Sequence, residues 1–353
     1  MSLSSLLPTL FPDHPTQTTI YTALALGATL GILLPESRAL LSWFRLHILH
    51  RSKLHLYHHR PSPNKQHNGN TTTHDSRSWA LITGASDGIG YGFVQELASA
   101  GFNIILHGRN QTKINGLIAE LRTQWPDHSY ESFICDATDR ESWAEKFDSL
   151  VKRLNGSNIN LTILVNNIGG NPDVARSFTP LSEYGVEELT RLVDMNATFP
   201  AQVTRAVLPM LQRNQPSLIL NMASAVGTEA VTMPYLVGYS GGKAFNRQFS
   251  KSLRMEMVAT GNESVEVMSI IAAKVQSGGM VTGTNWIVPS SREFARSVLG
   301  KVGCGRGEVT GWWSHSLQMW GMGLVPEWVR GRILVKVGRE EKRGMEEMHK
   351  KGS

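Results

Sequence analysis

The sequence predicts a doubly wound α/β fold, in which a parallel sheet is covered on both faces by helices. From Trp79 onward, short β-rich runs alternate with segments whose apolar residues recur at helical spacing. Continuous apolar strands separated by helices are typical of a parallel sheet buried on both faces. The expected strands are Ala80–Thr83, Asn103–His107, Ser132–Cys135, Thr162–Asn166, Ser217–Met222 and Val265–Ile271.

Composition divides the 353 residues into four expected parts. Residues 1–45 form an N-terminal segment with an apolar anchor at about 18–34, and residues 46–78 form a polar, His-rich linker. Residues 79–300 form the α/β domain, and residues 301–353 form a C-terminal helical extension. The anchor is an uncharged run of seventeen residues, near the minimum that spans a bilayer. Pro35 and Glu36 interrupt it, so a spanning helix and a shallow insertion both stay open.

The net charge of +6 comes mostly from one block of the chain. Residues 35–78 hold seven basic and two acidic residues, directly after the apolar run. This position favours a membrane surface over nucleic acid as the partner. Basic residues flank only the C-terminal side of the run, which predicts a cytosolic domain by the positive-inside rule. The six N-x-S/T sequons are then expected to stay unmodified.

Cysteine and histidine usage predicts neither a disulfide framework nor a metal site. Cys135 and Cys304 are the only two cysteines and lack metal-ligand spacing, which fits a reducing compartment. His58 and His59 are adjacent, but no further ligand stands at zinc-like spacing.

A glycine-rich turn follows the first expected strand and opens a helix. Glycines there let the backbone approach a pyrophosphate, whose charge the helix N-terminus stabilises. The spacing is G-x-x-x-G-x-G, which differs from the common dinucleotide fingerprint and from a P-loop. The turn predicts a Rossmann-type cofactor site formed by Gly84, Ser86, Asp87, Gly88, Ile89 and Gly90.

The segment after the second strand indicates NADPH rather than NADH as the cofactor. An acidic residue at this place would hold the free ribose 2′-hydroxyl of NAD. Residues 107–111 contain no acid and one arginine, Arg109, whose donors suit a 2′-phosphate. Asp136, just past the third strand, is expected to accept a hydrogen bond from the adenine amino group.

Tyr239 and Lys243 stand four residues apart, hence on one face of a helix. A phenol has an ordinary pKa near 10, which a nearby ammonium and an oxidised nicotinamide lower. Tyr239 is therefore a candidate proton donor to a carbonyl oxygen. Ser224 ends the fifth strand and is expected to hold that carbonyl, while Asn196 lies in a helix where it is expected to hold a water behind Lys243. Asn166 and Asn167 end the fourth strand, where parallel sheets place ligands.

TGASDGIG, NNIG, Asn196, Ser224 and YSGGK together resemble the motifs of the short-chain dehydrogenase/reductase family. Asp87, the NNIG motif, the anchor and the segments 287–299 and 310–315 are most similar to microsomal very-long-chain 3-ketoacyl-CoA reductases and related 17β-hydroxysteroid dehydrogenases. The resemblance covers roughly residues 20–353. It implies Ser224, Tyr239, Lys243 and Asn196 as a catalytic tetrad.

The same resemblance implies further cofactor contacts from Asn167, Tyr239, Lys243, Val275 and Ser277. Two features depart from the family pattern. Ser224 lies fifteen residues before Tyr239, where thirteen is more usual, so a small insertion must bulge between them. The family's Pro-Gly after the sixth strand is replaced by Ala272 and Ala273, which affects the cover over the substrate more than the chemistry.

The C-terminal segment carries two further signals. Lys350 and Lys351 match a dilysine signal for retrieval to the endoplasmic reticulum, which is read on the cytosolic side. Residues 312–337 are rich in Trp and Met and are expected to roof a lipophilic substrate, to rest on a membrane or to pack on the sheet. These alternatives stay open at this point.

The combined expectation is an NADPH-dependent reductase on the endoplasmic reticulum membrane, with a single N-terminal anchor, a cytosolic catalytic domain and no nucleic-acid partner. The resemblance implies reduction of a 3-ketoacyl-CoA to a 3-hydroxyacyl-CoA in fatty-acid elongation. The alternatives are a reductase of a steroid, terpenoid or polyketide intermediate, and a non-catalytic membrane scaffold. A homodimer through the helices around Tyr239 is a family-level expectation.

Overall fold

The computed structural model describes residues 34–59, 77–277 and 283–352, together with the single positions 22, 24 and 31. The chain divides into two units, Met1–His50 and Arg51–Ser353. In the first unit, residues 34–44 are helical and continue into the π-helical turn η1 (Arg45–Leu49). The expected anchor at 18–34 lies almost entirely outside the described residues.

Among the helices in the part of the chain that the structure describes, none has both the length and the apolar character needed to cross a bilayer.

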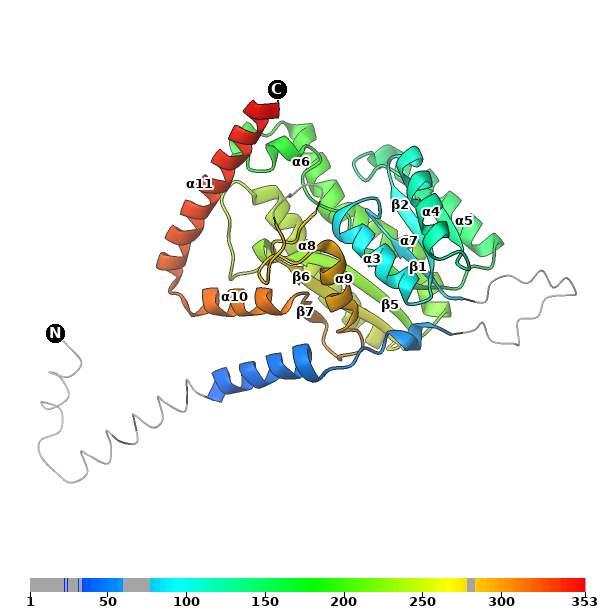
Figure 1. Ribbon diagram of the computed structural model, residues 1–353, viewed down its shortest axis with the longest axis horizontal. Helices are drawn as coiled ribbons and strands as arrows, with labels where there is room; N and C mark the ends of the chain where they lie inside the picture. The colour runs from blue at the N-terminus through cyan, green and yellow to red at the C-terminus, as the bar shows by residue number, and fades with distance from the viewer. Residues whose placement is uncertain are drawn as a thin grey trace, which may run out of the picture. The chain divides into compact units, whose positions relative to one another are not determined.

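The second unit is built on a seven-stranded, wholly parallel sheet with the order β3-β2-β1-β4-β5-β6-β7 (Figure 1). The strands are β1 (Trp79–Ile82), β2 (Asn103–Gly108), β3 (Tyr130–Ile134), β4 (Leu161–Asn166), β5 (Ser217–Ser224), β6 (Val265–Ala272) and β7 (Glu308–Thr310). All residues of β1, β2 and β4 are buried, because helices cover both faces. The predicted doubly wound parallel sheet is therefore confirmed.

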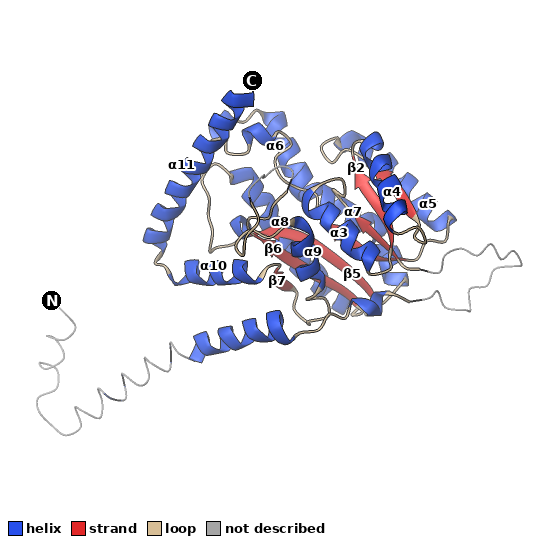
Figure 2. Cartoon of the chain, viewed as in Figure 1, coloured by secondary structure: helices blue, strands red, loops and turns tan. Residues whose placement is uncertain are grey.

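Helices cover both faces of this sheet, as Figure 2 shows. One face carries α3 (Gly88–Ser99), α4 (Gln111–Gln124) and α9 (Ser291–Leu299), and Glu96 of α3 pairs with Arg292 and Arg296 of α9. The other face carries α5 (Trp143–Gly156), α7 (Phe199–Arg213) and α8 (Val237–Ala259). Their apolar residues, such as Phe147, Val203 and Leu253, form one buried cluster with the strands.

The remaining helices lie at the carboxyl-end loops and the C-terminus. α6 (Val186–Val193) runs through the π-helical turn η7 (Asp194–Thr198) directly into α7. The chain ends in α10 (Trp313–Leu324) and α11 (Glu327–Gly352), whose side chains are described up to residue 347. The expected dilysine signal thus lies beyond the described side chains.

The domain is larger than the expected span of 79–300. Residues 308–310 add β7 to the sheet edge through pairing with β6, a strand too short to stand out in the sequence. Part of the expected linker also packs on the domain, because Thr162 Oγ1 donates to the carbonyl of Tyr57 at 2.9 Å. The Tyr57 hydroxyl donates to Glu266, and His58 stacks on Phe102. Residues 51–59 therefore differ from a solvated linker.

Candidate active site

The glycine-rich turn between β1 and α3 has a backbone shape that only glycine adopts readily. Gly84 and Gly88 have φ angles of +64° and +53°. A Cβ on Gly90 would lie 2.0 Å from the carbonyl oxygen of Gly84, so the turn and the helix meet there without side chains. Asp87 caps α3 by accepting from the backbone N–H of Gly88 at 2.6 Å. The turn thus brings the N-terminus of α3 to the carboxyl edge of the sheet, where a pyrophosphate site is expected.

His107, which the sequence analysis took only as a strand end, supports this turn from β2. Its Nδ1 accepts from the backbone N–H of Gly84 at 3.1 Å, and its Nε2 lies 3.1 Å from the carbonyl of Cys135. These partners fix the neutral tautomer that carries its proton on Nε2. Burial lowers the pKa of His107 to about 4, so the ring stays neutral at physiological pH.

The two asparagines that end β4 have structural contacts of different kinds. Asn167 donates from its backbone N–H to Thr83 Oγ1 at 2.9 Å and from Nδ2 to the Thr83 carbonyl at 3.1 Å. Asn166 donates to Thr204 Oγ1 at 2.7 Å and to Asn221 Oδ1 at 2.8 Å. Asn167 therefore lies against the glycine-rich turn, and Asn166 ties β4 to β5 and α7 inside the core.

The expected nucleotide-specificity residues follow β2 and β3. The Arg109 side chain is exposed at the start of the β2–α4 connection. Lys113, in the first turn of α4, lies 3.6 Å from Asp87 and so brings a second cation beside the turn. Asp136 Oδ1 accepts from the backbone N–H and the hydroxyl of Thr138, both at 2.8 Å, which orients its carboxylate after β3. Lys113 does not stand out in the sequence, because it is one lysine on a polar helix face.

Ser224, Tyr239 and Lys243 meet at the carboxyl edge of the sheet. The Ser224 side chain at the end of β5 lies close enough to the Tyr239 hydroxyl to lower the pKa of that group. Lys243 Nζ lies 5.7 Å from the centre of the Tyr239 ring and donates to the carbonyl of Met222 at 3.2 Å. The fifteen-residue spacing is accommodated by the turn η8 (Ala225–Gly227) and by Tyr235, whose φ is +68°. The insertion therefore leaves Ser224 in contact with Tyr239.

The protonation states of these groups suit proton donation. Burial raises the pKa of Tyr239, and the hydrogen bond from Ser224 acts in the opposite direction. Tyr239 is only partly exposed and keeps its proton at neutral pH. Burial lowers the pKa of Lys243 to about 8, so its amino group is charged in most molecules at pH 7.

Asn196 lies in the π-helical turn η7 and is fully buried. Its Oδ1 accepts from the backbone N–H of Gly170 at 3.0 Å, and its Nδ2 donates to the Gly170 carbonyl at 2.7 Å. A Cβ on Gly169 would lie 2.4 Å from Lys243 Nζ and 2.8 Å from Asn196 Oδ1. Asn196 and Lys243 therefore flank the same glycine.

Asn246, one turn after Lys243, holds this arrangement together. It is buried and donates from Nδ2 to the Asn196 carbonyl at 2.8 Å and to the Met222 carbonyl at 3.4 Å. The Met222 carbonyl also accepts from Lys243, so one strand carbonyl orients both α8 side chains. Asn246 was not predicted from the sequence; its spacing of three from Lys243 on the same helix face is the signal that was available.

Val275 and Ser277 follow β6 and lie close to the glycine-rich turn. Val275 is buried, and a Cβ on Gly88 would lie 2.9 Å from the Cβ of Ser277. Gln276 between them donates from its backbone N–H to the carbonyl of Pro289 at 3.0 Å. The structure thus brings the loop after β6 against the loop after β1, where the sequence analysis expects the nicotinamide.

His315 of α10 fixes the chain around Ala272 and Ala273. Its Nδ1 accepts from the backbone N–H of Ala273 at 3.3 Å, and its Nε2 lies 3.1 Å from the carbonyls of both Lys274 and Ile287. The side chain is fully buried, and burial lowers its pKa to about 4. A side chain from the C-terminal extension therefore holds the backbone after β6, where the family pattern has Pro-Gly.

His107 and His315 predict that the folded state loses stability in mild acid. The ordinary pKa of histidine is about 6.5, so below it the unfolded chain binds protons that the folded chain does not. We expect the free energy of unfolding to fall as pH drops from about 6.5 toward 4.5, by up to about 3 kcal/mol for each histidine. Urea denaturation at several pH values measures this slope. His315→Gln, which takes up no proton, should reduce the slope; an unchanged slope would contradict the assignment to His315.

The fold and this site define the class of the protein. A doubly wound sheet carries a glycine-rich nucleotide turn at the switch between β1 and β4, and a Ser-Tyr-Lys cluster stands at the same edge. A family model described as short chain dehydrogenase matches residues 78–286. The chain belongs to the short-chain dehydrogenase family and is an oxidoreductase.

Two relatives of this chain carry the same description, and one solved structure shares its fold. A very-long-chain 3-oxoacyl-CoA reductase of Neurospora crassa is 34% identical over 249 residues, which cover 69% of this chain and 71% of that protein. A protein of the same description from Podospora anserina is 34% identical over 248 residues, covering 69% and 70%. A solved short-chain dehydrogenase from Sphingobium yanoikuyae in complex with NADPH shares the fold, with a TM-score of 0.55 and 22% identity over 71% of this chain and 97% of that chain.

Proposed function

We propose that the protein is an NADPH-dependent reductase that converts a 3-ketoacyl-CoA to a 3-hydroxyacyl-CoA in fatty-acid elongation. The observation that carries the proposal is the Ser224–Tyr239–Lys243 cluster at the sheet edge beside the glycine-rich turn. Relatives at 34% identity that bear the description very-long-chain 3-oxoacyl-CoA reductase support the substrate class.

The residues around the turn fit a dinucleotide phosphate. The pyrophosphate would lie against Gly84–Gly90 at the N-terminus of α3, and Arg109 with Lys113 would hold the 2′-phosphate. Asp136 would accept from the adenine, with Asn167, Val275 and Ser277 next to the nicotinamide half. Bound NADPH supplies the hydride that the reaction requires.

The chain's own residues supply the proton and orient the ketone. Ser224 and the Tyr239 hydroxyl would hold the ketone oxygen, and Tyr239 would give its phenolic proton to that oxygen as the ketone is reduced. The charged Lys243 would stabilise the phenolate that remains, and it would also hold the nicotinamide ribose. Asn196 orients Lys243 through the backbone of residues 169–170, which lies next to both side chains. The ketone thereby becomes an alcohol.

NADPH oxidation against 3-ketoacyl-CoAs of increasing length, with ketosteroids alongside, tests the substrate class. Turnover that rises with acyl length is the expected result. Turnover of ketosteroids without turnover of any acyl-CoA would overturn the acyl substrate and favour a steroid or specialised intermediate. The Ala272–Ala273 replacement gives some support to that alternative. Failure to oxidise NADPH with any ketone would favour a non-catalytic scaffold, which the intact Tyr239 and Lys243 oppose.

Arg109→Asp tests the choice between NADPH and NADH. Charge-assisted hydrogen bonds contribute about 1.5–3 kcal/mol, so we expect KM for NADPH to rise about 10- to 100-fold while KM for NADH changes little or falls. Arg122→Asp is the matched control, because Arg122 is also an exposed arginine but lies within α4. Equal effects of both variants on KM for NADPH would contradict a 2′-phosphate contact at Arg109.

For the location of the enzyme, we propose the endoplasmic reticulum membrane, with the apolar segment at 18–34 as the anchor and the catalytic domain in the cytosol. The basic residues after that segment and the lysines at 350 and 351 support this topology. Glycosylation of Asn70 in cells would contradict it, because that modification requires the luminal side. Retention of a reporter by the last residues, lost on Lys350→Ser with Lys351→Ser, is the expected result for the retrieval signal.

A further inference from the structure

The bend formed by α10 and residues 327–339 of α11, here the α10–α11 elbow, carries a row of exposed large apolar side chains. Exposed apolar clusters of this kind mark interaction surfaces in proteins. The residues and their exposed fractions are Leu317 36%, Trp320 49%, Leu324 57%, Trp328 66%, Ile333 42% and Val335 40%.

The apolar side chains of α10 are exposed because the opposite side of the helix is buried against the domain. His315 and Ser314 face the domain and are fully buried. Leu317, Trp320 and Leu324 recur at spacings of three and four, so they share one face, opposite to His315 at about 100° per residue. Docking His315 on the backbone around Ala273 therefore turns an apolar face outward.

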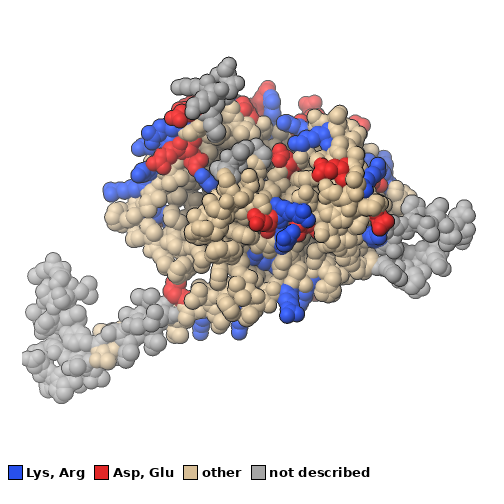
Figure 3. All heavy atoms as spheres, viewed as in Figure 1, with Lys and Arg blue, Asp and Glu red and all other residues tan. Residues whose placement is uncertain are grey.

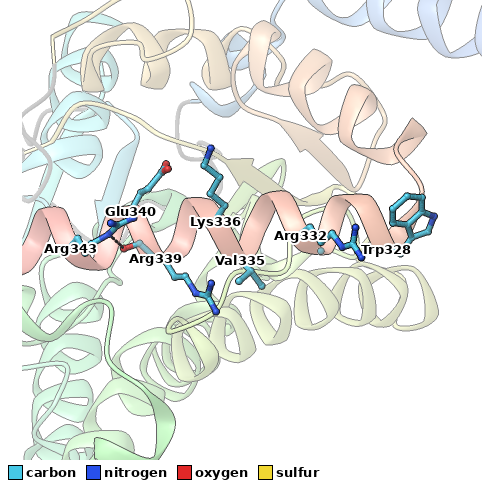
Figure 4. Close-up of a pocket in the computed structure, with 8 residues that line it drawn as sticks. Trp328, Arg332, Val335, Lys336, Arg339, Glu340 and Arg343 are labelled. Atoms are coloured by element: carbon cyan, nitrogen blue, oxygen red, sulfur yellow. Dashed lines mark hydrogen bonds between the residues drawn. The ribbon is translucent and has the colours of Figure 1, made fainter.

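Basic side chains border this apolar face. Residues 313–339 contain four basic residues and one acidic residue, a net charge of +3. Figure 3 shows uncharged surface over α10 and interspersed basic and acidic side chains along α11. The Arg332 guanidinium lies 5.3 Å from the centre of the Trp328 ring. A surface hollow along α11 is lined by Trp328, Gly331, Arg332, Val335, Lys336, Arg339, Glu340 and Arg343 (Figure 4).

The inner side of the elbow lies next to the candidate active site. Met319 packs against a small buried cluster of Ala223, Ala225 and Ile271, of which the two alanines flank Ser224. Further along α11, Glu341 pairs with Lys274, and Lys342 lies 5.2 Å from the centre of the Tyr235 ring. The same helices thus contact segments that flank the site on one side and expose apolar residues on the other.

We propose that the α10–α11 elbow is a membrane-docking surface that lies in the headgroup region of a bilayer containing anionic phospholipid. Trp and Leu on one face with Arg and Lys beside them are the composition of helices that lie in a membrane interface. The net charge of +3 favours anionic headgroups over the surface of a second copy, which would bring like charges together. A lipophilic ketone then reaches Ser224 and Tyr239 from the membrane side; this consequence rests on the proposed function, whereas the docking itself does not.

Site-specific labelling of the full chain tests the docking. In a Cys304→Ser background, which leaves the buried Cys135, Leu324→Cys carries a polarity-sensitive fluorophore. Val258→Cys, half-exposed at the end of α8, is the matched control. On phosphatidylcholine vesicles containing phosphatidylserine, we expect a blue shift at position 324, several-fold stronger quenching by a lipid-borne nitroxide and loss of quenching by aqueous iodide. Position 258 should show none of these changes.

Equal iodide quenching at positions 324 and 258 on vesicles would overturn the proposal. Shielding of position 324 that rises with protein concentration in the absence of lipid would also overturn it, since the elbow would then be an interface between copies. Lys336→Glu combined with Arg339→Glu should remove the dependence on phosphatidylserine. Because no substrate is present, these outcomes are independent of whether the protein reduces acyl-CoA.

Discussion

Tyr239→Phe is expected to lower kcat for NADPH-dependent ketone reduction by at least about a hundredfold, the usual contribution of a general acid. The change removes the hydroxyl that Ser224 contacts and keeps the ring beside Lys243. The burial of the site should therefore change little. Steady-state kinetics measure the loss, and NADPH fluorescence titration measures whether the cofactor still binds.

The matched control is Tyr235→Phe, in the loop before α8. Its ring lies beside Lys342 and keeps that contact when the hydroxyl is removed. We expect near-normal turnover and the same thermal unfolding midpoint for this variant. Full activity of Tyr239→Phe, or an equal loss in both variants, would show that the Tyr239 hydroxyl is not the proton donor.

The neighbouring glycines of α8 predict a large difference between two similar substitutions. A Cβ on Gly242 would lie 2.7 Å from the Cβ of Asn196, whereas a Cβ on Gly241 meets nothing within 4 Å. We expect Gly242→Ala to destabilise the fold by about 1–3 kcal/mol through overpacking. It should also lower kcat/KM by about a hundredfold, because it displaces Asn196 behind Lys243.

Gly241→Ala is the internal control for this experiment. Alanine is favoured over glycine in a helix by about 1 kcal/mol, so the variant should be as stable as the native protein or slightly more stable. Its activity should be retained. Denaturation and kinetics of the two variants side by side give the answer, and equal activities would mean that the position of Asn196 is unimportant for turnover.

Much of the fold could be predicted from the sequence, because buried parallel strands are continuous apolar runs. The six expected strands all exist, with ends that differ by up to two residues. β7 was missed because three residues at a sheet edge make no periodic pattern. The docking of residues 51–59 was missed for a different reason: it depends on Tyr57 reaching Thr162 and Glu266, more than a hundred residues away.

The candidate site was predictable where a motif carries the chemistry. Ser224, Tyr239 and Lys243 come together as expected, and Asn196 lies beside Lys243. The hydrogen bonds of three supporting residues could not be predicted from the local sequence pattern; these residues are His107, Asn246 and His315. Each acts on backbone groups that are brought near only by the folded sheet, so its partner is set by topology rather than by spacing.

The π-helical turn η7 joins α6 and α7 into one continuous helix and lets the side chains of its two halves face different parts of the structure. Such a turn accommodates one more residue than an α-helical turn, which rotates the preceding segment by about 100° relative to the following one. Val203 after the turn faces the sheet core, whereas Leu189 and Leu192 before it meet Gly238, next to Tyr239. Substitutions before the turn can therefore reshape the wall of the substrate site while the half of the helix that stabilises the fold stays in register.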